Sequence, residues 1–132
     1  MRFPPPTPFV LATYKSGDGK SVVVCVSDMP LATAAGATLT IIPPAVAQES
    51  ARAGRLDETL SENLHEVFNL ISSLFNHPNH PHLVLSEVVM RATALSSVLE
   101  APMRTPRERA DFEISISGYS SGKFSSWAIE LS

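Results

Sequence analysis

The sequence lacks the features that define secreted and membrane-spanning proteins. Only one of its 132 residues is cysteine, so no internal disulfide can form, and an unpaired thiol is typical of a reducing compartment. No segment approaches the roughly 20 consecutive apolar residues of a membrane-spanning helix. The N-terminus, Met-Arg-Phe-Pro-Pro-Pro, has no apolar core of a signal peptide. We therefore expect a cytoplasmic protein with no membrane partner.

Positive charge is also scarce. Ten lysines and arginines stand against 13 aspartates and glutamates, which gives a formal net charge of −3. Binding to nucleic acid requires a concentrated positive surface, so this composition argues against a nucleic-acid partner. The basic residues that do cluster are Arg104, Arg107 and Arg109. They alternate with Glu108 and Asp111, a pattern that favours a solvated loop.

Motifs of phosphate binding and nucleophilic catalysis are incomplete. Gly19-Lys20-Ser21 is similar to the end of a phosphate-binding loop, but Tyr14 stands where the motif requires an earlier glycine. A strand rather than a helix is predicted to follow, so the segment indicates a hairpin turn. Cys25 lies within an apolar run, which predicts a buried and unreactive thiol. No Ser-His-Asp or Cys-His set follows from the spacing.

Histidines are concentrated in one segment. His77, His80 and His82 share a short loop with two prolines, and histidine triplets can bind zinc. No cysteine or acidic residue recurs at ligand spacing within the loop, and only His65 could add a ligand. We therefore predict no metal site, and a metal-binding protein remains the weakest of the functional alternatives.

Apolar residues, by contrast, are plentiful. They make up 44% of the chain, which is enough for a hydrophobic core in one domain of this length. Four of the eleven prolines fall at positions 4, 5, 6 and 8. We predict a proline-rich N-terminal arm over residues 1–8 and a single domain over residues 9–132.

The local patterns predict strands at both ends of this domain and helices between them. The predicted elements are a hairpin of 9–14 and 21–26 around the turn 16–19, an alanine-rich helix over 31–42 capped by Asp28, a short helix over 45–53, a long helix from Asp57 or Thr59 to about Asn76, a strand over 83–92, an ambiguous segment over 94–100, a loop over 102–109, and strands over 112–117 and 123–131 around the turn 118–122. This order predicts an α+β fold with a largely antiparallel sheet and two or three helices packed on one face.

The long helix carries the clearest periodicity. Its apolar residues fall within an arc of about 120° and predict a face buried on the sheet: Leu60, Leu64, Val67, Phe68, Ile71, Leu74 and Phe75. Glu66 and Asn69 fall on the opposite side, one helical turn apart, so their side chains should project together. A polar stripe is usually only solvated. However, asparagine is a poor helix former and no lysine or arginine occurs in this helix, which points to a functional surface.

This helix resembles a known signature. Residues 60–71, Leu-Ser-Glu-Asn-Leu-His-Glu-Val-Phe-Asn-Leu-Ile, are similar to the Glu-x-x-Asn helix of the CheC/CheX/FliY chemotaxis phosphatases. The predicted order of elements is similar too. A single Glu-x-x-Asn pair resembles the CheX type rather than CheC, in which two such sites are common.

The resemblance implies a function for the pair. Members of this family hydrolyse the aspartyl phosphate of response-regulator receiver domains. By resemblance, Asn69 would orient the attacking water, Glu66 would pair with the receiver's active-site lysine, and the partner would supply the magnesium, so that the chain needs no cofactor of its own. Glu62, Ser73 and Ser86 stand where the family usually has Asp or Ser, Gly and Pro, respectively. We expect Glu62 and Ser73 to shape the partner-binding surface.

Two further expectations follow. CheX-like proteins form dimers by joining their sheets, so the resemblance implies a homodimer whose candidate edges are the strand over 112–117 and the strand that ends at Leu131. The alternative to a phosphatase is a non-enzymatic dimeric interaction module, which would have the same fold and use the same helix face for docking.

Overall fold

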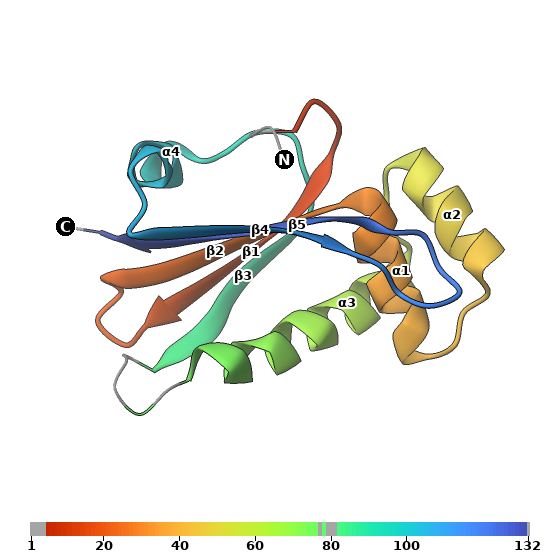
Figure 1. Ribbon diagram of the computed structural model, residues 1–132, viewed down its shortest axis with the longest axis horizontal. Helices are drawn as coiled ribbons and strands as arrows, with labels where there is room; N and C mark the ends of the chain where they lie inside the picture. Colours follow the sequence, from red (N-terminus) through yellow and green to blue (C-terminus); the bar gives the residue numbers. More distant parts are fainter. Residues whose placement is uncertain (1–4, 77, 79–81, 132) are drawn as a thin grey trace.

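The computed structural model describes residues 5–76, 78 and 82–131, and these residues fold around one five-stranded antiparallel sheet with the strand order β3-β1-β2-β5-β4 (Figure 1). The elements are β1 (Phe9–Ser16), β2 (Ser21–Asp28), α1 (Met29–Leu39), α2 (Pro44–Ala53), α3 (Glu58–Ile71), the 3-10 helix η1 (Ser72–Phe75), β3 (Leu83–Ala92), α4 (Ser97–Arg104), β4 (Glu108–Ile114) and β5 (Gly122–Glu130). The predicted α+β fold with an antiparallel sheet is confirmed.

The first hairpin forms where its turn residues predict it. Gly19 has a φ of 72° and its N–H donates to the carbonyl of Ser16, which closes the turn between β1 and β2. Asp18 completes the turn, because its carboxylate accepts hydrogen bonds from the Ser16 hydroxyl and the Lys20 N–H. The segment at 19–21 is therefore a hairpin turn, as predicted.

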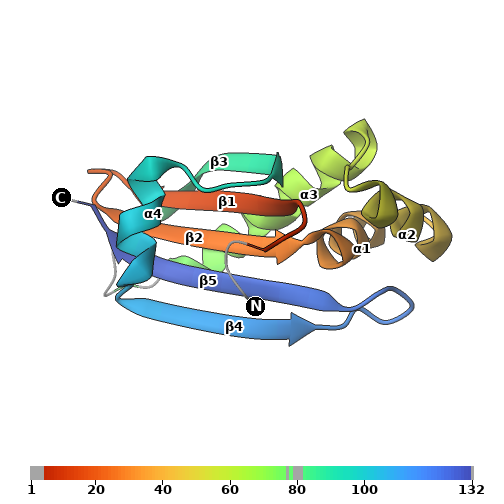
Figure 2. The ribbon, with the colours of Figure 1, turned by 90° about the horizontal axis from the view of Figure 1, so that it is seen from above.

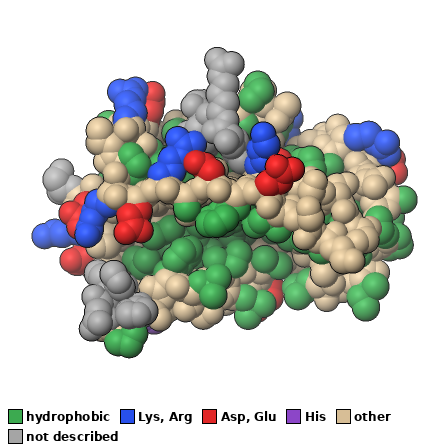
Figure 3. All heavy atoms as spheres, in the orientation of Figure 1, with side chains coloured by type: hydrophobic (Ala, Val, Ile, Leu, Met, Phe, Trp, Pro, Cys, Tyr) green, Lys and Arg blue, Asp and Glu red, His purple; other side chains and the backbone are tan. Residues whose placement is uncertain are grey.

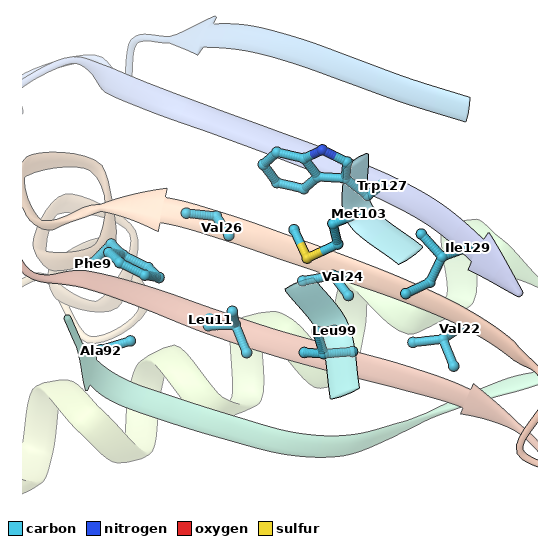
Figure 4. Packing of buried hydrophobic residues seen from close by; sticks show 10 residues of the cluster. All are labelled: Phe9, Leu11, Val22, Val24, Val26, Ala92, Leu99, Met103, Trp127 and Ile129. Atoms are coloured by element: carbon cyan, nitrogen blue, oxygen red, sulfur yellow. The ribbon is translucent and has the colours of Figure 1, made fainter. Parts of the chain in front are cut away.

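β2 lies in the middle of the sheet and is buried on both faces. Val24 faces one hydrophobic cluster and Cys25 the other, and neither side chain is accessible to solvent. The first cluster lies between the sheet and α4, where Leu99 and Met103 cover Trp127 and the strand valines (Figure 4). The second cluster lies between the sheet and α3. Because both faces of β2 pack against hydrophobic clusters, the residues of this strand from Val22 to Val26 are all apolar.

Helices α1 and α3 pack against each other on the second face of the sheet, and α4 covers the first (Figures 1 and 2). α1 begins at its predicted cap, Asp28, and α3 is capped by Asp57, one of the two starts predicted for it. The Asp28 carboxylate accepts from the N–H of Leu31, and the Asp57 carboxylate accepts from the N–H of Leu60. Gly54 ends α2 with a φ of 70°.

The prediction for the region before β4 was wrong in part. Residues 102–109 were expected to form a loop, but α4 continues to Arg104 and β4 begins at Glu108. Leu99 and Met103, one helical turn apart, are both buried on the sheet. Proline usually ends or kinks a helix, and α4 contains Pro102. The burial of Leu99 and Met103 stabilises the helix despite this proline.

The basic cluster is correspondingly not a loop. Arg104 belongs to α4 and Arg109 to β4, while Arg107 directly precedes β4 and donates its N–H to the carbonyl of Ala128. Each arginine has an exposed acidic partner, and these partners are Glu100, Glu130 and Asp111, respectively.

The last two strands differ from their predicted positions. β4 ends at Ile114 rather than Ser117, and it is an edge strand whose residues are mostly exposed. β5 was a candidate edge, but it pairs with β2 on one side and β4 on the other, so that prediction was wrong. Alternation within a strand reveals its two faces, but it does not reveal which strand lies beside it.

No helix within the described ranges is both long and apolar enough to cross a membrane.

Candidate functional site

The candidate site is the outward side of α3. The structure places Glu66 and Asn69 on the exposed side of this helix, while Leu60, Leu64 and Phe68 are buried under it. The predicted partner-binding residues, Glu62 and Ser73, are exposed as well. We call Glu62, Glu66, Asn69 and Ser73 the polar stripe.

Two buried contacts fix the position of α3. The hydroxyl of Tyr14, on β1, donates to the carbonyl of Phe68 at 2.7 Å and ties the C-terminal half of the helix to the sheet. Gly36, in α1, lets the two helices approach so closely that a Cβ built at this position would lie 3.0 Å from the carbonyl oxygen of Leu60. The outward residues are therefore carried by a firmly packed helix, which is what a precise site requires.

A third contact joins the ends of α1 and α3. The side-chain amide of Asn63 donates to the carbonyl of Gly36 at 2.9 Å and to the hydroxyl of Thr40 at 2.8 Å. Asn63 therefore occupies a structural position beside the polar stripe. Sequence reasoning missed this role, because the partners lie more than 20 residues away in the chain.

Glu66 and Asn69 are free to meet a partner. Within the described ranges their side chains make no hydrogen bond or ion pair. By contrast, the hydroxyl of Ser73 donates to the carbonyl of Leu70 at 2.8 Å, so this side chain is folded back on its own helix. Of the polar stripe, the predicted catalytic pair is thus available to an incoming group, whereas the Ser73 donor is already occupied.

Two exposed leucines lie beside the polar stripe. Leu70 is 58% exposed and Leu74 is 78% exposed. The 100° periodicity predicted a buried Leu74, but α3 ends at Ile71 and continues as a 3-10 turn. A 3-10 helix turns by about 120° per residue, so it rotates the residues that follow out of the α-helical pattern. The exposed position of Leu74 was therefore not visible in the sequence, whereas Leu70 lies in α3 outside the predicted apolar face.

The charge on α3 has one sign. Glu58, Glu62 and Glu66 are exposed, and the helix contains no lysine or arginine. These carboxylates create a negative surface that favours a partner with a cationic group.

A hollow of about 440 Å³ lies beside the helix, between η1 and the half of the sheet formed by β2, β5 and β4. Its lining is mostly apolar and includes Leu74 and Phe75 from η1, Val23 from β2, and Ala110 from β4. Figure 3 shows hydrophobic side chains gathered in the recess between the sheet and α3. On this face of the sheet Val23 and Ala110 are only partly buried.

The buried thiol does not contribute to a site. Cys25 is fully buried, and burial raises its pKa to about 12. A thiol with this pKa is protonated at neutral pH and is a poor nucleophile.

The histidine loop falls largely outside the described residues, which include neither His77 nor His80. Among the residues that are described, no group of three His, Cys, Asp or Glu side chains is arranged to hold a metal ion.

Comparison with protein-family models, with curated proteins and with solved structures gives no match to this chain.

Proposed function

We propose that this chain binds receiver domains of response regulators with the outward side of α3, and that Glu66 and Asn69 promote hydrolysis of the receiver's aspartyl phosphate. The observation that carries the proposal is the position of this pair. Both side chains are exposed on one side of a helix that is fixed to the sheet. Neither is engaged by another described residue.

The chemistry suits these two groups. In the reaction a water oxygen attacks phosphorus, the bond from phosphorus to the aspartate oxygen breaks, and phosphate and a free carboxylate result. Such a step depends on positioning and charge stabilisation more than on a strong base. The Asn69 amide can hold the water in line with phosphorus, and the Glu66 carboxylate can pair with a lysine of the receiver. The magnesium belongs to the receiver, so the chain itself contributes no metal ligand.

The test is a dephosphorylation assay. Receiver domains phosphorylated with a small phosphodonor are mixed with the protein, and loss of phosphate is followed over time. The wild type is expected to accelerate this loss. Asn69→Ala is expected to lower the rate about 100-fold, because a misplaced nucleophile costs about that factor.

Gln48→Ala is the matched control, since Gln48 is an exposed amide on the neighbouring helix α2 and should leave the rate unchanged. If Asn69→Ala retains the wild-type rate while circular dichroism shows it folded, the catalytic assignment is wrong.

A second candidate function is a non-enzymatic docking module. The specific observation that favours it is the apolar border of Leu70 and Leu74, because exposed leucines beside polar groups are typical of a protein interface. In the same assay, a receiver that binds but keeps its phosphate supports this alternative. Weaker binding by Leu74→Asn with unchanged binding by Gln48→Ala would place the interface at η1, where α3 ends.

A further inference from the structure

The two faces of the sheet are covered to different extents at β5. Trp127 and Ile129 belong to the cluster beneath α4 and are almost fully buried. Ser126 and Ala128 alternate with them along the strand, so they lie on the opposite face, where both are only partly buried. One face of β5 is therefore closed by α4, whereas the other keeps part of its surface accessible.

The accessible face continues onto the neighbouring strands. Val23 of β2 lies opposite Ala128, and Ser126 lies opposite Ala110 of β4. Together with two residues of η1, these side chains line the hollow of about 440 Å³ in the recess that Figure 3 shows. We call the surface that they form the sheet groove, and its residues are Val23, Leu74, Phe75, Ala110, Ser126 and Ala128.

Exposed apolar residues extend the sheet groove along β4. Phe112 follows Ala110 on the same face and is 53% exposed, and Ile114 is 37% exposed. Within the described part of the chain, no helix packs extensively against β4. A continuous apolar surface of this kind is typical of a site that another molecule covers.

The width of the sheet groove suits one α-helix. Neighbouring strands lie about 4.8 Å apart, so β5 and β4 together provide about 10 Å of sheet. An α-helix with its side chains has a diameter of about 10 Å. Helix α3 already packs on this face of the sheet. A second helix beside it would complete the helical layer and place its own apolar side chains on Ala110 and Ala128.

The charges around the sheet groove are unbalanced. Arg107 and Arg109 line the hollow, but each is paired with an acidic residue of the sheet. Glu108 lines it too, and its carboxylate makes no hydrogen bond or ion pair with a described residue. On the side of α3, Glu62 and Glu66 are exposed and the helix contains no lysine or arginine. A helix that enters the groove therefore meets an excess of negative charge, which favours cationic side chains beside its apolar stripe.

We propose that the sheet groove binds a basic amphipathic helix of a partner protein, whose apolar stripe lies on the strands and whose lysines or arginines lie beside Glu108 and α3. The acidic helix α3 of a second copy fits this site poorly, because like charges would face each other. The inference does not depend on the catalytic role proposed for Glu66 and Asn69, whose assay can fail while this one succeeds.

Three synthetic peptides of 14 residues, the length of α3, test the proposal by fluorescence anisotropy. The first has leucines at helical spacing with lysines beside them, the second has glutamates in place of the lysines, and the third has the composition of the first in scrambled order. The lysine peptide is expected to bind about tenfold more tightly than the other two, because several exposed ion pairs together change an affinity by about this factor. Equal binding of the lysine and glutamate peptides, or no saturable binding of the lysine peptide, overturns the proposal.

Variants of β4 locate the site. Ala110→Gln places a polar side chain in the floor of the sheet groove and is expected to weaken binding of the lysine peptide about tenfold. Glu113→Gln, on the opposite face of the same strand, should leave this binding unchanged. Circular dichroism of each variant separates a lost site from a damaged fold. If Ala110→Gln is folded and binds as the wild type does, the peptide does not occupy the groove.

Reversal of one charge tests the complementarity. Glu108→Lys is expected to weaken binding of the lysine peptide severalfold and to strengthen binding of the glutamate peptide. Glu49→Lys makes the same change in net charge at an exposed position of α2 and should alter neither affinity. Equal effects of the two substitutions would contradict a local role for Glu108.

Amide NMR spectra show which surface the peptide covers. The lysine peptide is expected to shift the signals of Val23, Ala110 and Ala128 and to become helical when it binds. A peptide that pairs with β4 as a strand, or that shifts only residues beneath α4, contradicts the proposal. So does a wild type that is dimeric without peptide and becomes monomeric in Ala110→Gln, because a second copy would then occupy the groove.

Discussion

Asp28 joins two elements through the two oxygens of one carboxylate. Oδ1 accepts the N–H of Leu31 and caps α1, while Oδ2 accepts the N–H of Lys123 at the start of β5. Gly122 leaves room for this junction, because a Cβ at this position would lie 2.3 Å from Oδ1 of Asp28 and 2.7 Å from Cβ of Leu31. One small residue thus permits a contact between segments almost 100 residues apart.

Gly122→Ala should therefore destabilise the protein strongly. The methyl group must displace the Asp28 carboxylate, so the cost combines overpacking with loss of a helix cap, about 2–4 kcal/mol in total. Urea unfolding measures this difference.

Gly17→Ala is the control for Gly122→Ala, because nothing lies within 4 Å of a Cβ built at Gly17. We expect little or no loss of stability for this variant. Equal costs for the two substitutions would contradict the proposed junction.

Helix α3 depends on contacts at both of its ends. Asn63 ties its N-terminal half to α1, and the hydroxyl of Tyr14 holds its C-terminal half on the sheet through the carbonyl of Phe68. The same carbonyl also accepts from the N–H of Ser72, so loss of the Tyr14 hydroxyl would not leave it without a donor. Glu66 lies between these two anchors in the chain, and Asn69 directly follows the second.

Tyr14→Phe should accordingly have a modest effect on global stability and a local effect on the helix. Removal of one buried hydrogen bond whose acceptor keeps a second donor is expected to cost about 1 kcal/mol. Amide hydrogen exchange in the last turn of α3 should become faster.

The comparison variant is Tyr119→Phe, which removes a hydroxyl donor to the carbonyl of Ile42 in another part of the fold. It should leave exchange in α3 unchanged. Unaltered α3 exchange in Tyr14→Phe would show that the hydroxyl does not anchor the helix.

The complete fold places two weak acids in its interior. Burial raises the pKa of Cys25 from 9.0 to about 12. Burial, with a smaller contribution from Cys25, raises the pKa of Tyr14 above its usual range. Each of these two side chains therefore stays protonated in the folded state at pH values where it has lost its proton in the unfolded chain.

Stability should therefore fall as the pH rises above 9.0, the ordinary pKa of the Cys25 thiol, toward about 12. The unfolded state binds fewer protons in this range, so each such group lowers the free energy of unfolding by up to about 1.4 kcal/mol per pH unit. Urea unfolding at a series of alkaline pH values measures the slope.

Cys25→Ala removes one of the two groups. Its stability at neutral pH should be lower, because a buried sulfur is lost, but its decline with pH should be shallower than that of the wild type. An unchanged slope would mean that the thiol does not couple folding to pH.

Local chemistry within the sequence was enough to predict the hairpin turn at Gly19, the cap Asp28, the strand over 83–92 and the outward position of Glu66 and Asn69. Each of these depends on residues within a few positions of one another, whose backbone preferences and periodicity act before any long-range contact forms. Local chemistry left Asp57 and Thr59 as alternative starts of the long helix, and the structure has Asp57.

Tertiary structure alone decided which strands are neighbours, which face α4 covers and where Leu74 points. Within the described part of the chain, β5 pairs with β2 and β4, whereas β4 pairs with β5 alone. Helix α4 forms because Leu99 and Met103 are buried on the sheet. Pairing and burial of this kind involve residues far apart in the chain, so their free energy is not encoded in any one local segment.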